Sequence, residues 1–343
     1  AEFLREHGAD LVVTDLRPPA ALEASVARLG DQGVRYVLGR HELADFEQAE
    51  IVVRNPAVPL DSQQLAAARA AGAAIEMEMT LFLRWCRAGQ VVGISGTRGK
   101  TTTATAIRDM LQAAGRPVAL AGNMRVSALA QLEAIEPEHV VVLELSSAQL
   151  YWLGQGKGWS PSIAGITNIA PNHLDWHGDM DHYLTCKESI AKTHTHEDVL
   201  IRGEHCDALP AGIELLVPGE HNRINAAMAA ALASAATNVS ADTLYSFRGL
   251  PHRLAAVEEH SSKRFFDDSK STTPEATVLA VNSFGDSTRI HLIAGGYDKG
   301  VSLAAIAELA PTLAGLYTIG ATGGMLSQSA GPTSTPCGTL DRA

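Results

Sequence analysis

The sequence is poor in cysteine and in long apolar runs. Its four cysteines, Cys86, Cys186, Cys206 and Cys337, are scattered and form no C-x-x-C pair, so it predicts neither a disulfide framework nor a zinc ribbon. No apolar run approaches the ~20 residues of a membrane-spanning helix, and the first residues are charged where a secretory signal would be apolar. We therefore expect a protein of the reducing cytoplasm that has no membrane partner.

Basic residues are also scarce relative to acidic ones. Lys and Arg number 27 against 38 Asp and Glu, which gives a formal net charge of −11. An acidic chain is a poor partner for nucleic acid or for anionic lipid, although it can hold a local basic pocket for phosphates. The 343 residues are enough for two or three hydrophobic cores, and we expect a monomer whose partners are small molecules.

Strand-like and helix-like segments alternate along the chain. Near the start, a β-branched run at 11–15 is followed by a helical stretch at 20–29, and the pattern repeats to about residue 88. This alternation is typical of βαβ units and predicts an α/β fold with a Rossmann-like first domain. Further buried strands are expected at 139–147 and 162–170, and the stretch GPTSTPCGT near the end of the sequence has the composition of a polar tail.

The segment QVVGISGTRGKTTTATAIRDMLQAAG has the composition of a strand, a glycine-rich turn and a helix. Glycines let backbone N–H groups approach an anion, Lys100 would meet the β- and γ-phosphates of ATP, and the Thr101 hydroxyl would ligate Mg²⁺. The strict phosphate-loop pattern has glycine where Ile94 stands, so this is a variant loop, and a plain strand-to-helix turn is the alternative. The ATP-binding residues expected in it are Gly96, Thr97, Gly99, Lys100, Thr101 and Thr102.

Seven more motifs follow this loop. They are ELSSAQL (144–150), TNIAPNHLDWHG (167–178), YLTCKESIAK (183–192), GEHNRINA (219–226), GLPHR (249–253), DDSKSTTPEA (267–276) and AGGYDKG (294–300). In this order, over nearly the whole chain, they resemble the Mur ligase family, above all its branch that joins D-glutamate to UDP-N-acetylmuramoyl-L-alanine. The resemblance implies an ATP-dependent amide ligase of peptidoglycan synthesis, and hence of cell wall biogenesis, cell shape and cell division.

The reaction implied by the resemblance proceeds through an acyl phosphate that the amine of D-glutamate then attacks. Such chemistry needs Mg²⁺, phosphate ligands and positioning more than a nucleophile. Glu144 would ligate Mg²⁺ with Thr101, and His173 would ligate a second Mg²⁺. Lys187 matches the lysine that the family carbamylates with CO₂, which turns a cation into an anion able to support two metal ions. Lys100, Glu144, His173 and Lys187 would thus be the catalytic set.

Each of these residues also has a simpler interpretation. Without its motif, Glu144 could be a strand-end acid in a surface ion pair. His173 could be an ordinary surface histidine, and Lys187 could be a solvated lysine on a helix.

The resemblance also assigns residues outside the loop. Asn222 and Asn225, with Arg253 and Asp268, would contact ATP, although Asn222 could simply cap a helix and Arg253 could be ion-paired. Lys299 and Thr272 would lie near the D-glutamate carboxylates, while Asp15 and Arg17 stand at a strand end where the family reads uracil. The full set implied for substrates is Asp15, Arg17, Asn123, Ser146, Lys270, Thr272 and Lys299.

Three domains are expected from this match. Residues 1–88 would bind the UDP end of the substrate, residues 89–248 would bind ATP, and residues 249–343 would close over ATP. The family pattern would add a first strand with a glycine loop, a longer stretch between Lys187 and Asn222, and a final segment with Ser and Phe, all of which we expect to be missing. Arg98 stands where the family usually has Asn, and we expect it to face solvent.

Other functions fit parts of the sequence. The chain could be another Mur-type amide ligase or a folylpolyglutamate synthase, although DDSKSTT and AGGYDKG replace the motifs expected of those siblings. It could be a Mur-like subunit of an amidotransferase complex, but its cysteines do not form the four-cysteine zinc insertion of that protein. It could also bind nucleotide without turnover. Release of phosphate that depends on both substrates would separate these alternatives.

Overall fold

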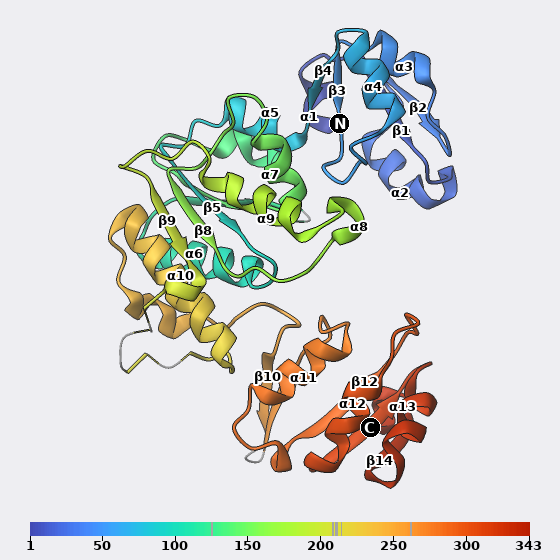
Figure 1. Cartoon of the computed structure of the whole chain (residues 1–343), viewed down its shortest axis with the longest axis vertical. Helices are drawn as coiled ribbons and strands as arrows, with labels where there is room; N and C mark the ends of the chain where they lie inside the picture. Colours follow the sequence, from blue (N-terminus) through green and yellow to red (C-terminus); the bar gives the residue numbers. More distant parts are fainter. Residues whose placement is uncertain (125, 208, 210–211, 214, 261–262) are drawn as a thin grey trace. The chain divides into compact units, whose positions relative to one another are not determined.

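The computed structural model describes residues 1–124, 126–207, 209, 212–213, 215–260 and 263–343. The chain divides into two compact units, coloured along the sequence in Figure 1. Unit 1 comprises residues 1–100, 115–204 and 235–237, and unit 2 comprises residues 101–114, 205–234 and 238–343. The domain boundaries expected near residues 88 and 248 stay a prediction.

The first part of unit 1 consists of two short parallel strand pairs, each joined through a helix. Pro19 begins the helix of the first pair, because its fixed φ suits the first helical position, and Ser62 caps that of the second by accepting from the Leu65 N–H. β1 pairs with β2 and β3 pairs with β4. The elements are α1 (Glu2–Glu6), β1 (Leu11–Asp15), α2 (Pro19–Leu29), β2 (Val34–Leu38), α3 (Leu43–Gln48), β3 (Ile51–Val53), α4 (Gln63–Ala70), β4 (Ala74–Glu76) and α5 (Glu78–Trp85).

A five-stranded parallel sheet, ordered β6-β7-β5-β8-β9, forms the centre of unit 1. Its strands are β5 (Gln90–Ser95), β6 (Val118–Gly122), β7 (Val140–Glu144), β8 (Ile163–Ile166) and β9 (Val199–Arg202). Every residue of β7 is buried, as expected for a parallel strand covered on both faces. The register places Glu144 beside both Gly122 and Ile94, so three strands end together and their following loops meet at one edge.

Three helices follow these strands within unit 1. They are α7 (Ser147–Leu153), α8 (Leu174–His177) and α9 (Met180–Glu188), and α7 and α9 lie on one side of the sheet in Figure 1. The core beneath them joins Leu143 of β7 to Leu150 of α7 and Phe82 of α5. This packing holds the loops at the carboxyl edge of the sheet in place.

Unit 2 contains a second, smaller parallel sheet, ordered β12-β13-β14. Ile306, Leu316 and Leu326 form its core, and Thr273 caps α11 by accepting from the Ala276 N–H. β10 and β11 form an antiparallel pair. The elements are α6 (Lys100–Ala113, whose first residue lies in unit 1), α10 (Glu220–Thr237, whose last turn lies in unit 1), β10 (Ala255–His260), β11 (Lys263–Asp267), α11 (Pro274–Asn282), β12 (His291–Gly295), α12 (Ala304–Leu309), β13 (Gly315–Ile319), α13 (Gly323–Ala330) and β14 (Ser334–Gly338).

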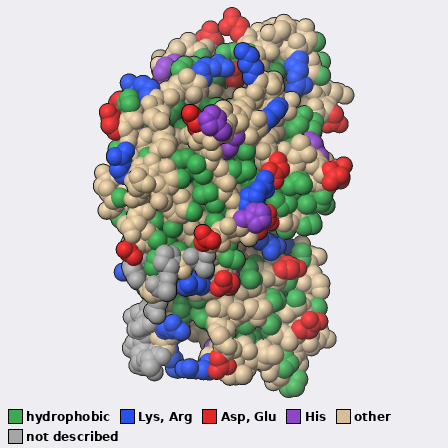
Figure 2. All heavy atoms as spheres, turned by 60° about the vertical axis from the view of Figure 1, so that its left-hand side comes forward, with side chains coloured by type: hydrophobic (Ala, Val, Ile, Leu, Met, Phe, Trp, Pro, Cys, Tyr) green, Lys and Arg blue, Asp and Glu red, His purple; other side chains and the backbone are tan. Residues whose placement is uncertain are grey.

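Short 3₁₀ turns complete the chain. They are η1 (Leu129–Ala134), η2 (Ser189–Ala191), η3 (Gly203–His205), η4 (Ala241–Ser246), η5 (Ser287–Arg289), η6 (Ala310–Thr312), η7 (Gly331–Thr333) and η8 (Leu340–Arg342). Among the described residues, no helix is long and apolar enough to cross a membrane. On the face in Figure 2, Lys and Arg side chains are interspersed with Asp and Glu side chains.

The α/β fold with parallel sheets is confirmed, and one local expectation is wrong. The stretch expected to be a polar tail forms β14, which pairs with β13 in parallel and buries Cys337. Pairing to a neighbouring strand outweighs the weak strand propensity of Ser, Thr, Pro and Gly at this position.

Candidate functional site

The phosphate loop is locked onto the segment that follows β8. Gly96 has φ +135°, and a Cβ there would lie 1.9 Å from Thr167 Oγ1, so only glycine fits. Thr97 Oγ1 donates to the Ala170 carbonyl at 3.1 Å and accepts from the Ala170 N–H at 2.9 Å. These contacts fix the loop against the 167–170 segment, as an anion cradle made of backbone groups requires.

Lys100 folds back over this loop. Its Nζ donates to Gly96 O at 3.0 Å and to Thr97 O at 3.1 Å. Thr101 and Thr102 follow as the next residues of α6. Arg98 is exposed, as expected. The lysine charge thus lies directly on the loop that the sequence predicts to receive phosphate.

Lys187 reaches the same loop from α9, although it is 91 residues further along the chain. Its Nζ donates to Gly96 O at 2.8 Å, and the side chain is only 2% exposed. Burial, together with the smaller effect of the nearby Lys100 charge, lowers the pKa of its ammonium to about 7. The interpretation of Lys187 as a solvated surface lysine is therefore wrong.

Glu144 ends β7 at the same edge and is 3% exposed. Asn123 donates from Nδ2 to Glu144 Oε1 at 3.2 Å, and its backbone N–H donates to Glu144 O at 2.7 Å. Gly122 makes this close approach possible, because a Cβ there would lie 2.1 Å from Glu144 O. The interpretation of Glu144 as a surface ion-pair acid is wrong, and Asn123 orients its carboxylate.

Ser146 and His173 both stand at the starts of helices in unit 1. Ser146 caps α7, where its Oγ accepts from the Gln149 N–H at 3.2 Å. His173 is exposed, precedes α8 and has φ +52°. The substrate contact of Ser146 and the metal ligation of His173 stay predictions.

Asp15 and Arg17, expected to contact the uracil ring, form an ion pair with each other. Arg17 Nη2 lies 2.8 Å from Asp15 Oδ2, and the Arg17 backbone N–H donates to Asp15 Oδ1 at 2.8 Å. The bonds from Arg17 lower the pKa of the Asp15 carboxyl. The pair lies at the end of β1, and its uracil contact stays a prediction.

In unit 2, Asn222 and Asn225 share one face of α10 and are both buried. The helix cap is Gly219, not Asn222. Asn222 lies in the first turn, and its Nδ2 donates to the Pro218 carbonyl at 2.6 Å. The interpretation of Asn222 as a helix cap is therefore wrong, and its role toward ATP stays a prediction.

The remaining expected residues of unit 2 lie largely at its surface. Asp268 Oδ1 accepts from the Leu254 N–H at 3.0 Å, and the Lys270 N–H donates to His252 O at 3.0 Å. These bonds join the DDSK segment to the GLPHR turn. The exposed residues of the set are Arg253, Lys270, Thr272 and Lys299.

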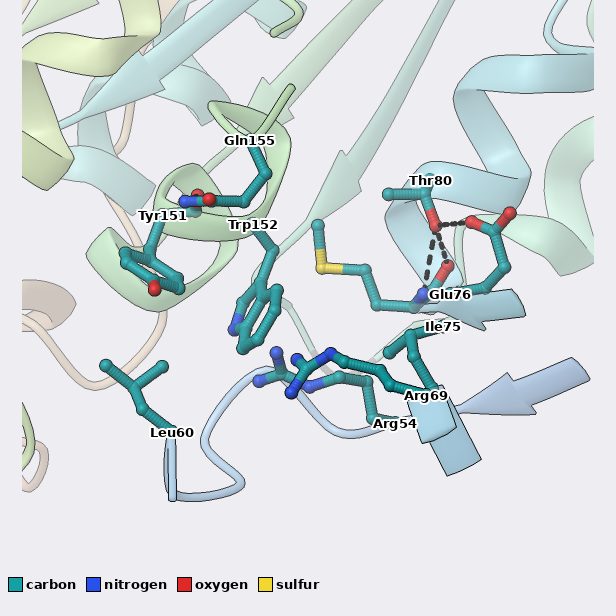
Figure 3. Close-up of a pocket in the computed structure, with 10 residues that line it drawn as sticks. Arg54, Leu60, Arg69, Ile75, Glu76, Thr80, Tyr151, Trp152 and Gln155 are labelled. Atoms are coloured by element: carbon teal, nitrogen blue, oxygen red, sulfur yellow. Dashed lines mark hydrogen bonds between the residues drawn. The ribbon is translucent and has the colours of Figure 1, made fainter. Parts of the chain in front are cut away.

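Unit 1 contains a pocket of about 460 Å³ that no local sequence pattern indicated. Arg54, 6% exposed, places its guanidinium carbon 3.5 Å from the centre of the Trp152 ring, as Figure 3 shows. Burial lowers the pKa of Arg54 to about 10. Among the described residues, Arg54 Nη1 and Trp152 Nε1 are buried donors without a hydrogen-bond partner. The lining residues are Arg54, Leu60, Arg69, Ile75, Glu76, Met77, Thr80, Tyr151, Trp152 and Gln155.

A second missed feature is a group of three side chains whose types can ligate a metal ion: His177, His182 and Cys186. The spacing of His182 and Cys186, four residues apart on one helix, was the available signal. The contribution of His177 from α8 depends on tertiary structure and has no local signature.

Comparison with known proteins identifies the family. The Mur ligase middle domain matches residues 94–207. UDP-N-acetylmuramoylalanine–D-glutamate ligase of Roseiflexus sp. (strain RS-1) is 40% identical, over 87% of this chain and 75% of that protein. The enzyme of the same name from Acidobacterium capsulatum is 32% identical, over 93% of this chain and 78% of that protein.

Solved structures agree on the fold. The second crystal structure of MurF from Acinetobacter baumannii has a TM-score of 0.59 at 19% identity, and the match covers 95% of this chain and 83% of that one. This likeness supports the α/β architecture alone. The sequence relatives carry the assignment further: the chain belongs to the Mur ligase family, and within it to the UDP-N-acetylmuramoylalanine–D-glutamate ligases, which use ATP to add D-glutamate in peptidoglycan synthesis.

Proposed function

We propose that this ligase carries out its chemistry around the Gly96 carbonyl, where Lys100 and Lys187 meet. The supporting observation is that both ammonium groups donate to that one oxygen, at 3.0 Å and 2.8 Å. Two cations so close repel each other in a water-poor site. An arriving anion removes that repulsion, and ATP and the acyl phosphate both carry phosphate anions.

The residues present fit Mg²⁺. Glu144 supplies a buried carboxylate at the same sheet edge, and carboxylate oxygens are preferred ligands of Mg²⁺. Glu144, Thr101, His173 and carbamylated Lys187 would hold the metal ions, which would neutralise charge on the phosphates.

The side chains and backbone of the loop then act by positioning. Lys100 and the loop N–H groups hold the phosphoryl group as it passes to the acceptor carboxylate, with Gly96, Thr97, Gly99, Thr101 and Thr102 forming the cradle. Asn123 keeps the Glu144 carboxylate aimed at this place. The amine of D-glutamate then attacks the acyl phosphate and releases phosphate.

We further propose that Lys187 is carbamylated. Its Nζ would form a bond to the carbon of CO₂ and lose a proton, which leaves a carbamate anion. Its burial, at 2% exposure, excludes the water that would favour an ammonium. The change would replace the repulsion between Lys187 and Lys100 by attraction.

The remaining substrate contacts are proposed from the resemblance of the motifs that carry these residues. Arg253, Asp268, Asn222 and Asn225 would contact ATP. Lys270, Thr272 and Lys299 would contact D-glutamate, whose two carboxylates suit exposed lysines. Asp15, Arg17 and Ser146 would contact the nucleotide-sugar.

The pocket of Figure 3 would receive an anionic part of the nucleotide-sugar. The support is that the Arg54 guanidinium lines this pocket and that its Nη1 is buried without a hydrogen-bond partner among the described residues. An anion bound there would pair with the Arg54 charge.

The overall organisation is also a proposal. We propose a monomer of three domains, divided near residues 88 and 248. The four cysteines are all free, which supports a reducing cytoplasm.

The test is release of phosphate by the purified protein, with the nucleotide-sugar and D-glutamate omitted in turn. We expect sustained release only when both are present. Lys100→Ala should abolish turnover at saturating ATP while the fold stays intact, because it removes a charge from a loop rather than packing from a core. Arg98→Ala, an exposed change in the same loop, is the matched control. A near-normal kcat for Lys100→Ala would refute the assignment of the loop.

A further inference from the structure

Two short helices of unit 1 bring three potential metal ligands together. His177 ends α8, while His182 and Cys186 lie one turn apart on α9. One nitrogen of each imidazole and the cysteine sulfur all lie within 4.8 Å of one another. His177 and Cys186 are 6% and 3% exposed, whereas His182 is partly exposed, so the cluster is built into the fold and keeps one open side.

The hydrogen bonds around the cluster leave lone pairs where a cation needs them. His177 Nε2 lies 2.9 Å from Ser147 Oγ. When Nε2 carries the ring proton and donates it to Ser147, His177 Nδ1 keeps a lone pair that can bind a cation. His182 Nδ1 lies 3.1 Å from the His177 carbonyl oxygen, which can only accept, and 3.2 Å from His177 Nδ1. When His182 Nδ1 donates its proton to the carbonyl, the lone pair of His177 Nδ1 stays available to a cation. His182 Nε2 is therefore unprotonated in the neutral ring, and it lies 3.6 Å from Cys186 Sγ. Each imidazole thus has an oxygen partner that orients it, as ligating histidines usually do.

The donor set indicates which cations would bind. Two imidazoles and a thiolate suit borderline-soft cations such as Zn²⁺, whereas Mg²⁺ and Ca²⁺ prefer oxygen. Three protein ligands with an open fourth position for water are a common arrangement around Zn²⁺. The separations are slightly longer than bonded ligands would show, and small side-chain rotations would close them.

We propose that His177, His182 and Cys186 bind a thiophilic divalent cation of the Zn²⁺ class. On binding, the cation takes the place of the Cys186 thiol proton, which goes to solvent, and bonds to one nitrogen of each histidine. The complex joins the end of α8 to the middle of α9. His173 precedes α8 and Lys187 follows Cys186, so the cation would stiffen the segment that carries both residues.

The test uses Co²⁺ as a spectroscopic probe of the chelator-treated full chain, in excess Mg²⁺ so that oxygen-rich sites are occupied. We expect one equivalent of Co²⁺ to give a thiolate-to-cobalt charge-transfer band and the visible bands of tetrahedral cobalt. One equivalent of Zn²⁺ should abolish both bands and raise the thermal unfolding midpoint.

Variants decide which residues are responsible. Cys186→Ser should lose the charge-transfer band, whereas Cys206→Ser, at a partly buried cysteine outside the cluster, should keep it. Ser147→Ala should weaken cobalt binding roughly 10-fold, the usual effect of losing a hydrogen-bond partner of a ligand. Circular dichroism of each variant without metal checks that it is folded.

Two results would overturn the proposal. One is a charge-transfer band that survives in folded Cys186→Ser, and the other is the absence of any such band in the unmodified chain. Because metal binding is read without turnover, neither result bears on the ligase chemistry.

Discussion

Two charged residues predicted at the carboxyl edge of the central sheet differ sharply from the residues of unit 2 that are predicted to contact D-glutamate. Lys187 and Glu144 are 2% and 3% exposed and have fixed partners, whereas Lys270, Thr272 and Lys299 are exposed. Groups that stabilise a developing charge act best when they are held in place beforehand. Groups that select a substrate can be ordered by that substrate. We therefore expect changes at the first region to lower kcat and changes at the second to raise KM.

The largest effect is expected for Lys187→Ala. Removing this buried amine would also remove the proposed carbamate, and the loss of one preorganised charged group typically lowers kcat roughly 100-fold or more. Steady-state phosphate release at saturating substrates measures it, and NMR of protein equilibrated with ¹³C-bicarbonate reports the carbamate directly.

Lys157→Ala, at an exposed lysine of the same unit, is the control and should keep the normal kcat. An active Lys187→Ala enzyme, together with no carbamate signal in the unmodified chain, would remove Lys187 from the site.

A pair of glycine substitutions compares the rigidity of the two regions. At Gly96 a Cβ would lie 1.9 Å from Thr167 Oγ1, whereas at Gly300 it would meet nothing within 4 Å, although both residues have positive φ. Gly96→Ala should lower the free energy of unfolding by roughly 3 kcal/mol through strain and overpacking, and Gly300→Ala by about 1 kcal/mol through strain alone. Urea unfolding measures both. Equal losses would mean that the phosphate loop is no more tightly held than the exposed turn.

A smaller effect is expected at the pocket of Arg54. Arg54→Gln keeps much of the side-chain length but removes the charge, and a lost charge-assisted hydrogen bond is worth about 2 kcal/mol. The KM for the nucleotide-sugar should therefore rise roughly 30-fold, while the KM for ATP stays constant. Arg87→Gln, at an exposed arginine, is the control. Unchanged KM values in Arg54→Gln would mean that Arg54 does not bind substrate and that its cation–π contact with Trp152 only stabilises the fold.

Local patterns predicted most of the elements and the loop, but not the contacts between distant segments. The strand at 11–15 and the phosphate loop have signals within a few residues. By contrast, burial of Lys187 against Gly96 depends on parallel strands and a helix packing correctly, and nothing near Lys187 distinguishes it from a solvated lysine. The resemblance singled it out, and the structure explains why it is unusual.

The wrong expectations and the missed pocket also arise from contacts that local sequence patterns do not specify. The residues of β14 have a weak propensity for strands, and pairing with β13 decides their conformation. Asn222 has the chemistry of a helix cap, but Gly219, at φ +102°, occupies the cap position three residues earlier. The Arg54 and Trp152 contact joins residues 98 positions apart, which no local signal reveals.

The smallest effect is expected for Lys299→Ala. An exposed ion pair is worth at most about 1 kcal/mol because water and salt screen it, so the KM for D-glutamate should rise about fivefold with kcat nearly unchanged. Lys263→Ala, at another exposed lysine of unit 2, should leave that KM unchanged. The rise should shrink at high salt, because the same screening weakens the contact in the unmodified chain. A fall in kcat as large as that of Lys187→Ala would show instead that Lys299 is preorganised for the chemical step. That result would contradict the assignment of the exposed residues of unit 2 to substrate binding alone.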